Sequence, residues 1–396
     1  MRNILLASYG GGHAEIISAI ASELIRRGQR PKVVGFTTAY QRFKSQGIPA
    51  ESIEALIDKN EDIPYLDGAT QYLPEENHPS ISHEQSKAYF ALGLRDLVHS
   101  YGWEKAVSLL NNQGRKAFLP VESMKRYLEK IGPDIVVSTT SPRFELAMHK
   151  AARQLGIPSL AVADLFIQDE RAWILKSDYA PYLAVICQQV ADEVVAGGFE
   201  KGNVRVTGNP AFDSLAKKST DISLRNSLRA RLGLTGKTVV LWPGPGGKIS
   251  NVGRPFCTPE EFVDAMEPVC RRNSNFRYLM RPHPNMPFSL PKNSEHGLLD
   301  DRKLLPEEAI LIADVVCFDI STMGLQAALR GLPSISVGFG DYQPFGKYGL
   351  TSVAETIEEA VLLIERDEIS PSPKFQMPPL GSACENVLNF IDDILS

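Results

Sequence analysis

Residues 3–13, with the sequence NILLASYGGGH, decide the fold class of this chain. Residues 3–8 have the character of a buried strand, and the three glycines that follow interrupt it. Residues 14–27 carry apolar side chains at helical spacing and Gly28 ends that helix, before residues 32–36 return to strand character. The opening therefore predicts a βαβ unit, the building block of a parallel sheet covered by helices.

The same alternation continues to the end of the chain. Further strands are expected at residues 134–138, 159–163, 238–242, 276–280, 315–318 and 334–337. Helices are expected at residues 86–131, 143–155, 259–272 and 323–330. Turn-forming residues after 204–206 indicate a domain boundary near residue 210. We therefore predict an α/β fold with two Rossmann-like domains, residues 1–210 and 211–380, followed by a C-terminal helix within 381–396.

The composition of the 396 residues, 43% hydrophobic and 22% charged, is that of a globular protein. The formal net charge of -5 argues against a nucleic acid as the main partner, because such binding depends on a basic surface. No apolar run approaches the roughly 18 residues of a membrane-spanning helix, and no signal peptide is recognisable, so we expect a cytoplasmic protein. The five cysteines have no CxxC spacing and predict no metal site.

The glycine turn at residues 10–12 is the first candidate binding feature. Glycines let a ligand approach the backbone and the following helix offers unpaired N–H groups, so Gly11 and Gly12 are predicted to contact a polar group of a ligand. His13 is a candidate catalytic base, because a neutral imidazole can accept a proton from a hydroxyl group. A tight turn in which His13 only caps the helix is the alternative. A dinucleotide site is not expected, since residues 35–38, GFTT, offer no acidic residue.

Two further strand ends in the first half carry polar residues. Residues 138–145, STTSPRFE, include Ser141 as a candidate ligand-binding residue and Glu145 as a candidate catalytic residue. Residues 163–166, ADLF, add Asp164 as a second candidate carboxylate for acid/base chemistry or substrate orientation. Helix capping and surface charge are the alternative explanation.

In the second half, a glycine-rich loop follows the strand at residues 238–242. Gly244, Gly246 and Gly247 allow close contact with a diphosphate, and Lys248 can neutralise its charge. Two prolines in this loop remove N–H donors and make it unlike a Walker loop. A glycine-rich turn without a function is the alternative.

Two more loops of the second half carry candidate phosphate ligands. Prolines stiffen residues 281–285, RPHPN, where Arg281 and His283 can donate to phosphate oxygens. Ser321 and Thr322 start a helix directly after a strand, so their hydroxyl and N–H groups can form an anion site. A solvent-exposed histidine and an ordinary N-cap are the respective alternatives.

These motifs, taken in order, resemble those of glycosyltransferase-B enzymes: the GGGH turn, the VTGNP segment at residues 206–210, the His283-Pro284 pair and the Ser321-Thr322 pair. The resemblance covers essentially the whole chain in motif order. It implies two Rossmann-like domains in a glycosyltransferase-B arrangement with an interdomain cleft. It also implies that the C-terminal domain holds a nucleotide-activated sugar and that the N-terminal domain holds the acceptor, which Gly11, Gly12 and Ser141 would contact. It further implies that neither a metal nor another cofactor is needed.

The resemblance gives two indications about the nucleotide. The HP and ST pairs are similar to those of bacterial sialyltransferases, Kdo transferases and teichoic acid glycerophosphotransferases, which implies a CMP- or CDP-linked donor. The GGGH turn is similar to the acceptor-side loop of UDP-sugar lipid glycosyltransferases and of nucleotide-sugar hydrolases. UDP-sugar transferases and the related UDP-N-acetylglucosamine 2-epimerases carry a glutamate for the ribose where this chain has Gln326, which we assign to donor binding. The acidic catalytic set of the epimerases is not matched at residues 162–166.

The function implied is transfer of a sugar from a CMP-, CDP- or UDP-linked donor to a hydroxyl group of a glycan or lipid-linked acceptor, in bacterial cell-surface glycan synthesis. A lipid-linked acceptor would add a peripheral contact with the inner face of the membrane. The alternatives are a nucleotide-sugar hydrolase or UDP-N-acetylglucosamine 2-epimerase-like enzyme, and a non-catalytic nucleotide-sugar-binding protein. The sequence leaves the oligomeric state open.

Overall fold

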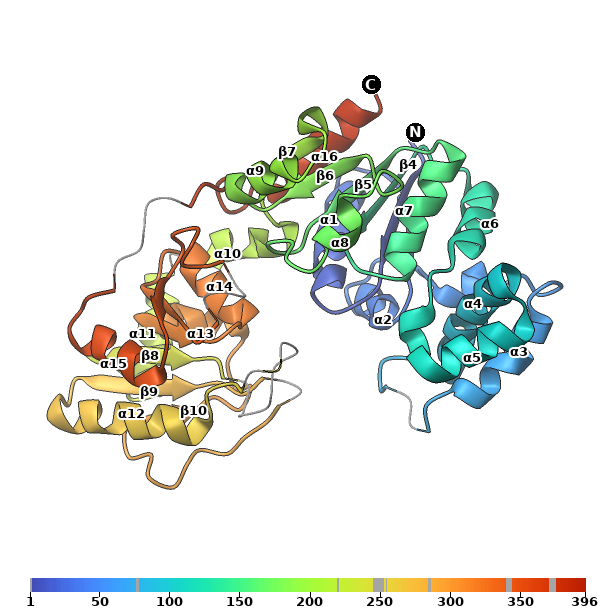
Figure 1. Ribbon diagram of the computed structural model, residues 1–396. Helices are drawn as coiled ribbons and strands as arrows, with labels where there is room; N and C mark the ends of the chain where they lie inside the picture. The colour runs from blue at the N-terminus through green and yellow to red at the C-terminus, as the bar shows by residue number, and fades with distance from the viewer. Residues whose placement is uncertain are drawn as a thin grey trace. The chain divides into compact units, whose positions relative to one another are not determined.

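The computed structural model describes residues 2–75, 78–218, 221–244, 253, 255–283, 286–339, 344–369 and 375–396. The chain divides into two compact units (Figure 1). Unit 1 comprises Met1–Asp213 together with Met377–Ser396, and unit 2 comprises Ser214–Gln376. The division falls close to residue 210, and the C-terminal segment belongs to unit 1.

Unit 1 is built on a seven-stranded sheet whose strand pairs are parallel. Its strands are β1 (Ile4–Ser8), β2 (Lys32–Gly35), β3 (Glu51–Ser52), β4 (Ile135–Thr139), β5 (Ser159–Val162), β6 (Tyr182–Val185) and β7 (Val204–Val206). They lie in the order β3-β2-β1-β4-β5-β6-β7. The side chains of β1, β4 and β5 are all buried, as expected for strands covered by helices on both faces.

The α-helices of unit 1 are α1 (Gly12–Arg26), α2 (Thr38–Ser45), α3 (Ile63–Ala69), α4 (His83–Tyr101), α5 (Trp103–Gln113), α6 (Val121–Ile131), α7 (Phe144–Leu155), α8 (Arg171–Ile174), α9 (Gln188–Ala196) and α16 (Ala383–Ile394). Short 3-10 helices are η1 (Ile53–Leu56), η2 (Thr70–Tyr72), η3 (Gly114–Ala117), η4 (Lys201–Asn203) and η5 (Pro210–Phe212). The helix α10 (Asp213–Lys218) starts at the division between the units. The predicted helical region 86–131 is thus three helices, with Gly102 at a positive φ of 78° between the first two.

Unit 2 repeats this architecture with six strands. They are β8 (Thr238–Trp242), β9 (Phe276–Met280), β10 (Gly297–Leu299), β11 (Val315–Phe318), β12 (Ser334–Val337) and β13 (Ser352–Ala354), in the order β10-β9-β8-β11-β12-β13 and with parallel pairing. Its helices are α11 (Ile222–Arg231), α12 (Pro259–Arg272), α13 (Pro306–Ile312), α14 (Thr322–Leu329) and α15 (Ile357–Glu365). A capping box formed by Thr258 and Glu261 starts α12.

Both sheets change their winding direction at the pair formed by their first and fourth strands. In unit 1 this pair is β1 and β4, and in unit 2 it is β8 and β11. Ligands of open parallel sheets bind beyond the carboxyl ends of the strands at such a point. The loops after these four strands contain most of the site residues that the sequence predicts.

The C-terminal helix α16 completes the core of unit 1. Its buried residues Val387, Leu388, Phe390 and Ile391 belong to the same apolar cluster as the inward face of α1. Figure 1 shows this red helix among the blue and green elements of unit 1. The helix α16 therefore closes a core whose other members come from elements as far away in the sequence as α1 and β6. No helix of the described residues is long and apolar enough to span a membrane.

Candidate functional site

The glycine turn after β1 is held close to the start of α2. A Cβ atom on Gly10 would lie 2.2 Å from the Thr38 hydroxyl oxygen, and Gly11 has a φ of 59°, so both positions need glycine. No side chain caps the N-terminus of α1. Gly11 and Gly12 line a surface cavity of about 440 Å³ together with Thr38 and Arg42. The turn therefore borders a cavity on the surface, where Gly11 and Gly12 stay predicted ligand contacts.

A chain of hydrogen bonds joins His13 on α1 to Thr139 at the end of β4 and Glu145 on α7. The Thr139 hydroxyl lies 2.8 Å from Nδ1 of His13 and donates to Oε2 of Glu145 at 2.5 Å. Because that hydroxyl proton points to Glu145, its oxygen accepts from Nδ1–H of the ring. In a neutral ring, this contact fixes the tautomer in which Nε2 of His13 carries the lone pair and can accept a proton.

Glu145 is fully buried, and both oxygens of its carboxyl group accept hydrogen bonds. The backbone N–H of Tyr9 donates to Oε1 at 2.5 Å, and the backbone N–H of Thr139 donates to Oε2 at 2.7 Å. Burial raises the pKa of the Glu145 carboxyl, while His13 and these hydrogen bonds act in the opposite direction. Glu145 therefore lies behind His13 and Thr139, where it orients them through hydrogen bonds.

Two more carboxyl groups face His13 from the loop after β5. Oδ2 of Asp164 lies 3.9 Å from Nε2 of His13, and both side chains remain about one-fifth exposed. Glu170 is half-buried, and its pKa is raised by burial and by the charges of Asp164 and Asp169. The sequence predicts His13, Glu145 and Asp164 as candidate catalytic residues, and the structure brings these three together. Thr139 and Glu170 are not predicted as site residues. Thr139 is one of several polar residues at a strand end, and no motif surrounds Glu170.

Two residues beside this cluster have strained backbones. Arg143, between β4 and α7, has a φ of 67°, and its guanidinium lies 5.1 Å from the centre of the Tyr9 ring. Ile167, a β-branched residue in the loop that carries Asp164, has a φ of 51°. Such conformations cost roughly 1–3 kcal/mol each and persist where the surrounding structure imposes them, commonly at functional sites. Ser141, the third predicted acceptor ligand, is buried between β4 and α7 and lines none of the cavities described here.

Unit 2 has its own cavity, of about 300 Å³, at the carboxyl ends of β8 and β11. Its polar lining includes His283, Asp319, Ser321 and Thr322, and its apolar lining includes Pro243, Phe256, Met286, Ile320 and Met323. Burial and the charge of Arg302 lower the pKa of His283, which favours the neutral ring. The hydroxyl of Ser321 caps α14 by accepting from the N–H of Met323 at 3.2 Å. His283, Ser321 and Thr322 thus share one cavity, as a common phosphate site requires.

The remaining predicted ligands of unit 2 differ in their surroundings. Arg281 forms an ion pair with the buried carboxylate of Asp300 and donates to the Leu304 carbonyl at 2.9 Å, so its guanidinium supports the loops beside β9. Gly244 packs against the ring of Trp242, where a Cβ atom would clash at 2.1 Å. Gln326 lies half-buried on α14 and does not line the cavity. Gly246, Gly247 and Lys248 lie outside the described residues.

Asp319 also lines the cavity of unit 2, and the sequence does not predict it as a site residue. Its side chain is 4% exposed and its Oδ2 accepts the backbone N–H of Cys257 at 3.1 Å. Burial, with a contribution from the charge of Glu261, raises the pKa of Asp319 to about 7. Its place between a strand and an N-cap serine is a sequence signal, but nothing in the sequence shows its burial.

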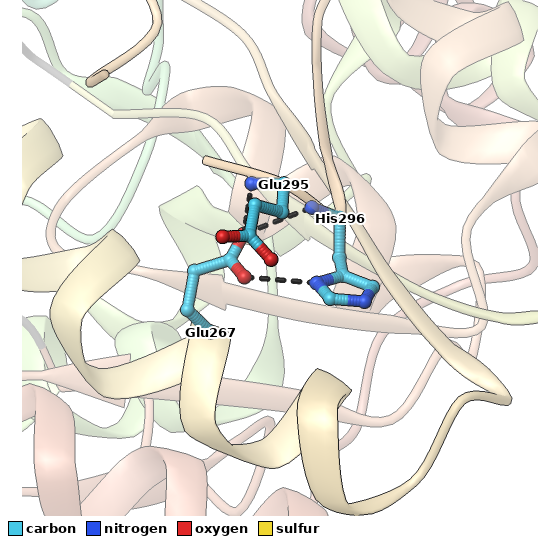
Figure 2. A group of neighbouring side chains, drawn as sticks. All are labelled: Glu267, Glu295 and His296. Atoms are coloured by element: carbon cyan, nitrogen blue, oxygen red, sulfur yellow. Dashed lines mark hydrogen bonds and ion pairs between the residues drawn. The ribbon is translucent and has the colours of Figure 1, made fainter. Parts of the chain in front are cut away.

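One group among the described residues has the composition of a metal site, namely Glu267, Glu295 and His296 (Figure 2). Glu267 on α12 already accepts four hydrogen bonds: from the Tyr278 hydroxyl at 2.5 Å, from the backbone N–H groups of Glu295 and His296 at 2.8 and 2.9 Å, and from Nδ1 of His296 at 2.9 Å. Glu295 is exposed and pairs with Arg271. These contacts are those of an anchor that fixes the loop before β10 to α12.

The fold and the loops define a class: two Rossmann-like units, each with a parallel sheet in doubly wound order, as in glycosyltransferase-B proteins. Solved UDP-N-acetylglucosamine 2-epimerases share this architecture. The enzyme of Methanocaldococcus jannaschii matches with a TM-score of 0.62 at 12% identity, over 99% of this chain and 100% of that chain. The enzyme of Neisseria meningitidis, solved with bound UDP-N-acetylglucosamine, matches with a TM-score of 0.60 at 13% identity, over 99% and 100%.

The MnaA protein of Staphylococcus aureus, solved with UDP, gives a TM-score of 0.60 at 12% identity over 100% of this chain and 97% of that one. No protein-family model and no curated protein sequence matches the chain. The similarity in structure confirms the predicted fold class over the full length of the chain.

Proposed function

We propose that this chain is an enzyme that acts on a nucleotide-linked sugar and that it epimerises a UDP-linked N-acetylhexosamine. The observation that carries the proposal is the hydrogen-bonded chain of His13, Thr139 and Glu145, with Asp164 and Glu170 around it. Inversion of a carbon that bears hydrogen needs one group to remove a proton and another to return a proton to the opposite face. This cluster offers several such groups within one small region.

The roles follow from the geometry of each group. His13 has Nδ1 fixed by Thr139, so Nε2 is the atom that takes up or delivers a proton. Glu170 has a raised pKa, which favours its acting as an acid near neutral pH. Glu145 balances the positive charge that forms on His13 during the reaction, through the Thr139 hydroxyl. Removal of one acid/base group of this kind lowers turnover by roughly 10²–10⁴-fold.

Unit 2 supplies the nucleotide site in this proposal. His283, Ser321 and Thr322 line one cavity beyond the ends of β8 and β11, and α14 presents its N-terminus there. The apolar side chains of Phe256 and Met286 line the same cavity. The solved structures with this fold that contain UDP or UDP-N-acetylglucosamine support a uridine nucleotide as the first ligand to test.

A deuterium-exchange experiment tests the proposal. The protein is incubated with UDP-N-acetylglucosamine in D2O without any acceptor, and proton NMR follows the hydrogen at C2 of the sugar. We expect loss of the C2 proton signal and appearance of the C2 epimer in the wild-type protein, and neither change in a His13→Gln variant. An intact C2 proton after prolonged incubation with a correctly folded wild-type protein would rule out epimerisation.

Glycosyl transfer, the function expected first from the sequence, remains the second candidate. It is favoured by His13, whose Nε2 suits removal of one hydroxyl proton. Gln326, which stands where UDP-sugar transferases and epimerases alike carry a glutamate, bears on the nucleotide and not on the choice between the two reactions. In the same NMR experiment, transfer would leave C2 undeuterated. It would release the nucleotide only after addition of a hydroxyl acceptor.

A further inference from the structure

Among the described residues, Asp319 is the one carboxyl group that lines the cavity of unit 2. It follows β11 directly and lies three residues before Thr322, the first residue of α14. Its Oδ2 accepts a single backbone hydrogen bond, from Cys257, and no ion pair to Asp319 occurs among the described residues. The other polar side chains of the cavity can all donate hydrogen bonds: His283, Ser321 and Thr322. The presence of a carboxyl group among these hydrogen-bond donors needs an explanation.

Within the part of the chain that the structure describes, the groups that face Asp319 are either neutral or negative. Cys257 approaches from the segment before α12, Glu261 from α12, and Cys317 from β11. His283 lines the same cavity from the loop after β9, and its lowered pKa keeps its ring neutral near pH 7. Burial and the charge of Glu261 therefore raise the pKa of Asp319 to about 7, without a compensating cation among these neighbours.

A phosphate bound in this cavity would place a second negative charge beside Asp319. Two like charges at short range in a partly water-excluded site repel strongly, and protonation of one of them removes that repulsion. A protonated carboxyl group also becomes a donor and can hydrogen-bond to a phosphate oxygen. The chemistry of the cavity thus favours the neutral acid when an anion is bound.

We propose that Asp319 contacts the phosphate of the bound nucleotide as a neutral carboxylic acid, so that nucleotide binding takes up a proton from solution. The inference rests on the proposed nucleotide site of unit 2. The opposite behaviour is expected if Asp319 instead accepts hydrogen bonds from ribose hydroxyl groups or from the base, because those contacts stabilise the carboxylate and release a proton. The donors Ser321 and Thr322, which follow Asp319 after one intervening residue and start α14, favour a phosphate at this position.

Calorimetry counts the protons exchanged on binding. UDP-N-acetylglucosamine is the probe, because its diphosphate has no group that titrates near neutral pH. The full-length His13→Gln variant is the protein, since it prevents turnover and removes a second histidine that could bind a proton. Titrations at pH 8 in HEPES and in Tris, which differ in ionisation enthalpy and carry no phosphate, should show uptake of about one proton per nucleotide, and the Kd should rise on the order of tenfold between pH 7 and pH 8.5.

Asp319→Asn in the same background is the matched control, because the amide keeps the shape and a hydrogen-bond donor without a titrating group. We expect it to bind with no proton uptake and with a Kd that stays constant over this pH range. Proton release by the parent protein, binding without any proton exchange, or uptake that persists in Asp319→Asn would each overturn the inference while leaving the nucleotide site in place. Failure of a folded parent protein to bind the nucleotide at any of these pH values would overturn the proposed function and the inference together.

Discussion

The orientation of the His13 ring depends on one uncharged group, the hydroxyl of Thr139. This hydroxyl accepts from Nδ1 of His13 and donates to the buried Glu145, so it transmits the influence of the carboxylate to the ring. A Thr at the end of β4 is thereby as informative about the site as the histidine itself. Thr139 is a positioning residue in the proposed reaction, because its hydroxyl acts through His13.

We expect Thr139→Val to lower kcat by roughly 10- to 100-fold with a small change in KM, because the ring loses the partner that fixes its tautomer. Thr139→Ser keeps the hydroxyl and should restore most of the activity. The C2 exchange rate and its pH profile measure both effects, and the pH profile of Thr139→Val should differ from that of the wild type. Equal activity of the valine and serine variants would show that the hydroxyl has no such role.

Sequence patterns predict which candidate residues lie close together when those residues follow strands. His13, Glu145 and Asp164 converge, and His283, Ser321 and Thr322 share a cavity, because strand ends of a parallel sheet meet at one edge. The interpretation of Arg281 as a phosphate ligand meets a competing contact, its ion pair with Asp300 from another loop. Asp319 and Glu170 escape prediction because their properties arise from burial and neighbouring charges, which a local pattern does not reveal.

At the scale of secondary structure, the strands with long apolar runs are predicted within one or two residues, and β8, β9, β11 and β12 are predicted at their observed bounds. The strands β10 and β13 have three residues each. Those of β10 are all half-buried and those of β13 range from buried to exposed, so neither strand has a recognisable periodicity. The strand β6 lies in a continuous apolar run, where periodicity cannot separate a strand from a buried helix. Tertiary pairing with β5 and β7 settles its conformation.

The helix α16 shows how far an element can act from its place in the sequence. Phe390 is buried, its ring centre lies 6.0 Å from that of Tyr182 on β6, and the guanidinium of Arg205 on β7 lies 4.3 Å from it. Phe390→Ala should lower the free energy of unfolding of unit 1 by about 3 to 5 kcal/mol, through lost burial and a cavity.

Hydrogen exchange followed by mass spectrometry resolves this effect by unit. Exchange in Phe390→Ala should accelerate in peptides from α1 and α16 and stay unchanged in peptides from β8 and α12. The neighbouring Asn389 is exposed, so Asn389→Ala should leave both units as in the wild type. Unchanged exchange of α1 in Phe390→Ala would show that α16 contributes little to the core of unit 1.

At the scale of the whole molecule, the two units repeat one strand order but carry different chemistry. The loops after β1, β4 and β5 in unit 1 gather acid/base groups, whereas those after β8, β9 and β11 in unit 2 gather hydrogen-bond donors around a cavity. The doubly wound topology explains the common position of both groups, and the loop sequences explain their difference. The proposed function divides accordingly into proton transfer by unit 1 and nucleotide binding by unit 2.

This division predicts that two histidine substitutions change different quantities. One weakens the binding of UDP, and the other abolishes exchange at C2. His283→Ala removes a donor from the cavity of unit 2, so the Kd for UDP should rise roughly 10- to 100-fold, the range expected when a hydrogen bond to a charged group is lost. His13→Gln should leave the Kd for UDP within about twofold of the wild-type value while it abolishes C2 exchange, because UDP carries no sugar for unit 1 to act on. Isothermal titration with UDP and the NMR exchange assay measure the two quantities on the same preparations. If His283→Ala binds UDP as tightly as the wild type, the cavity of unit 2 does not hold the nucleotide phosphate, and the nucleotide must bind to other residues.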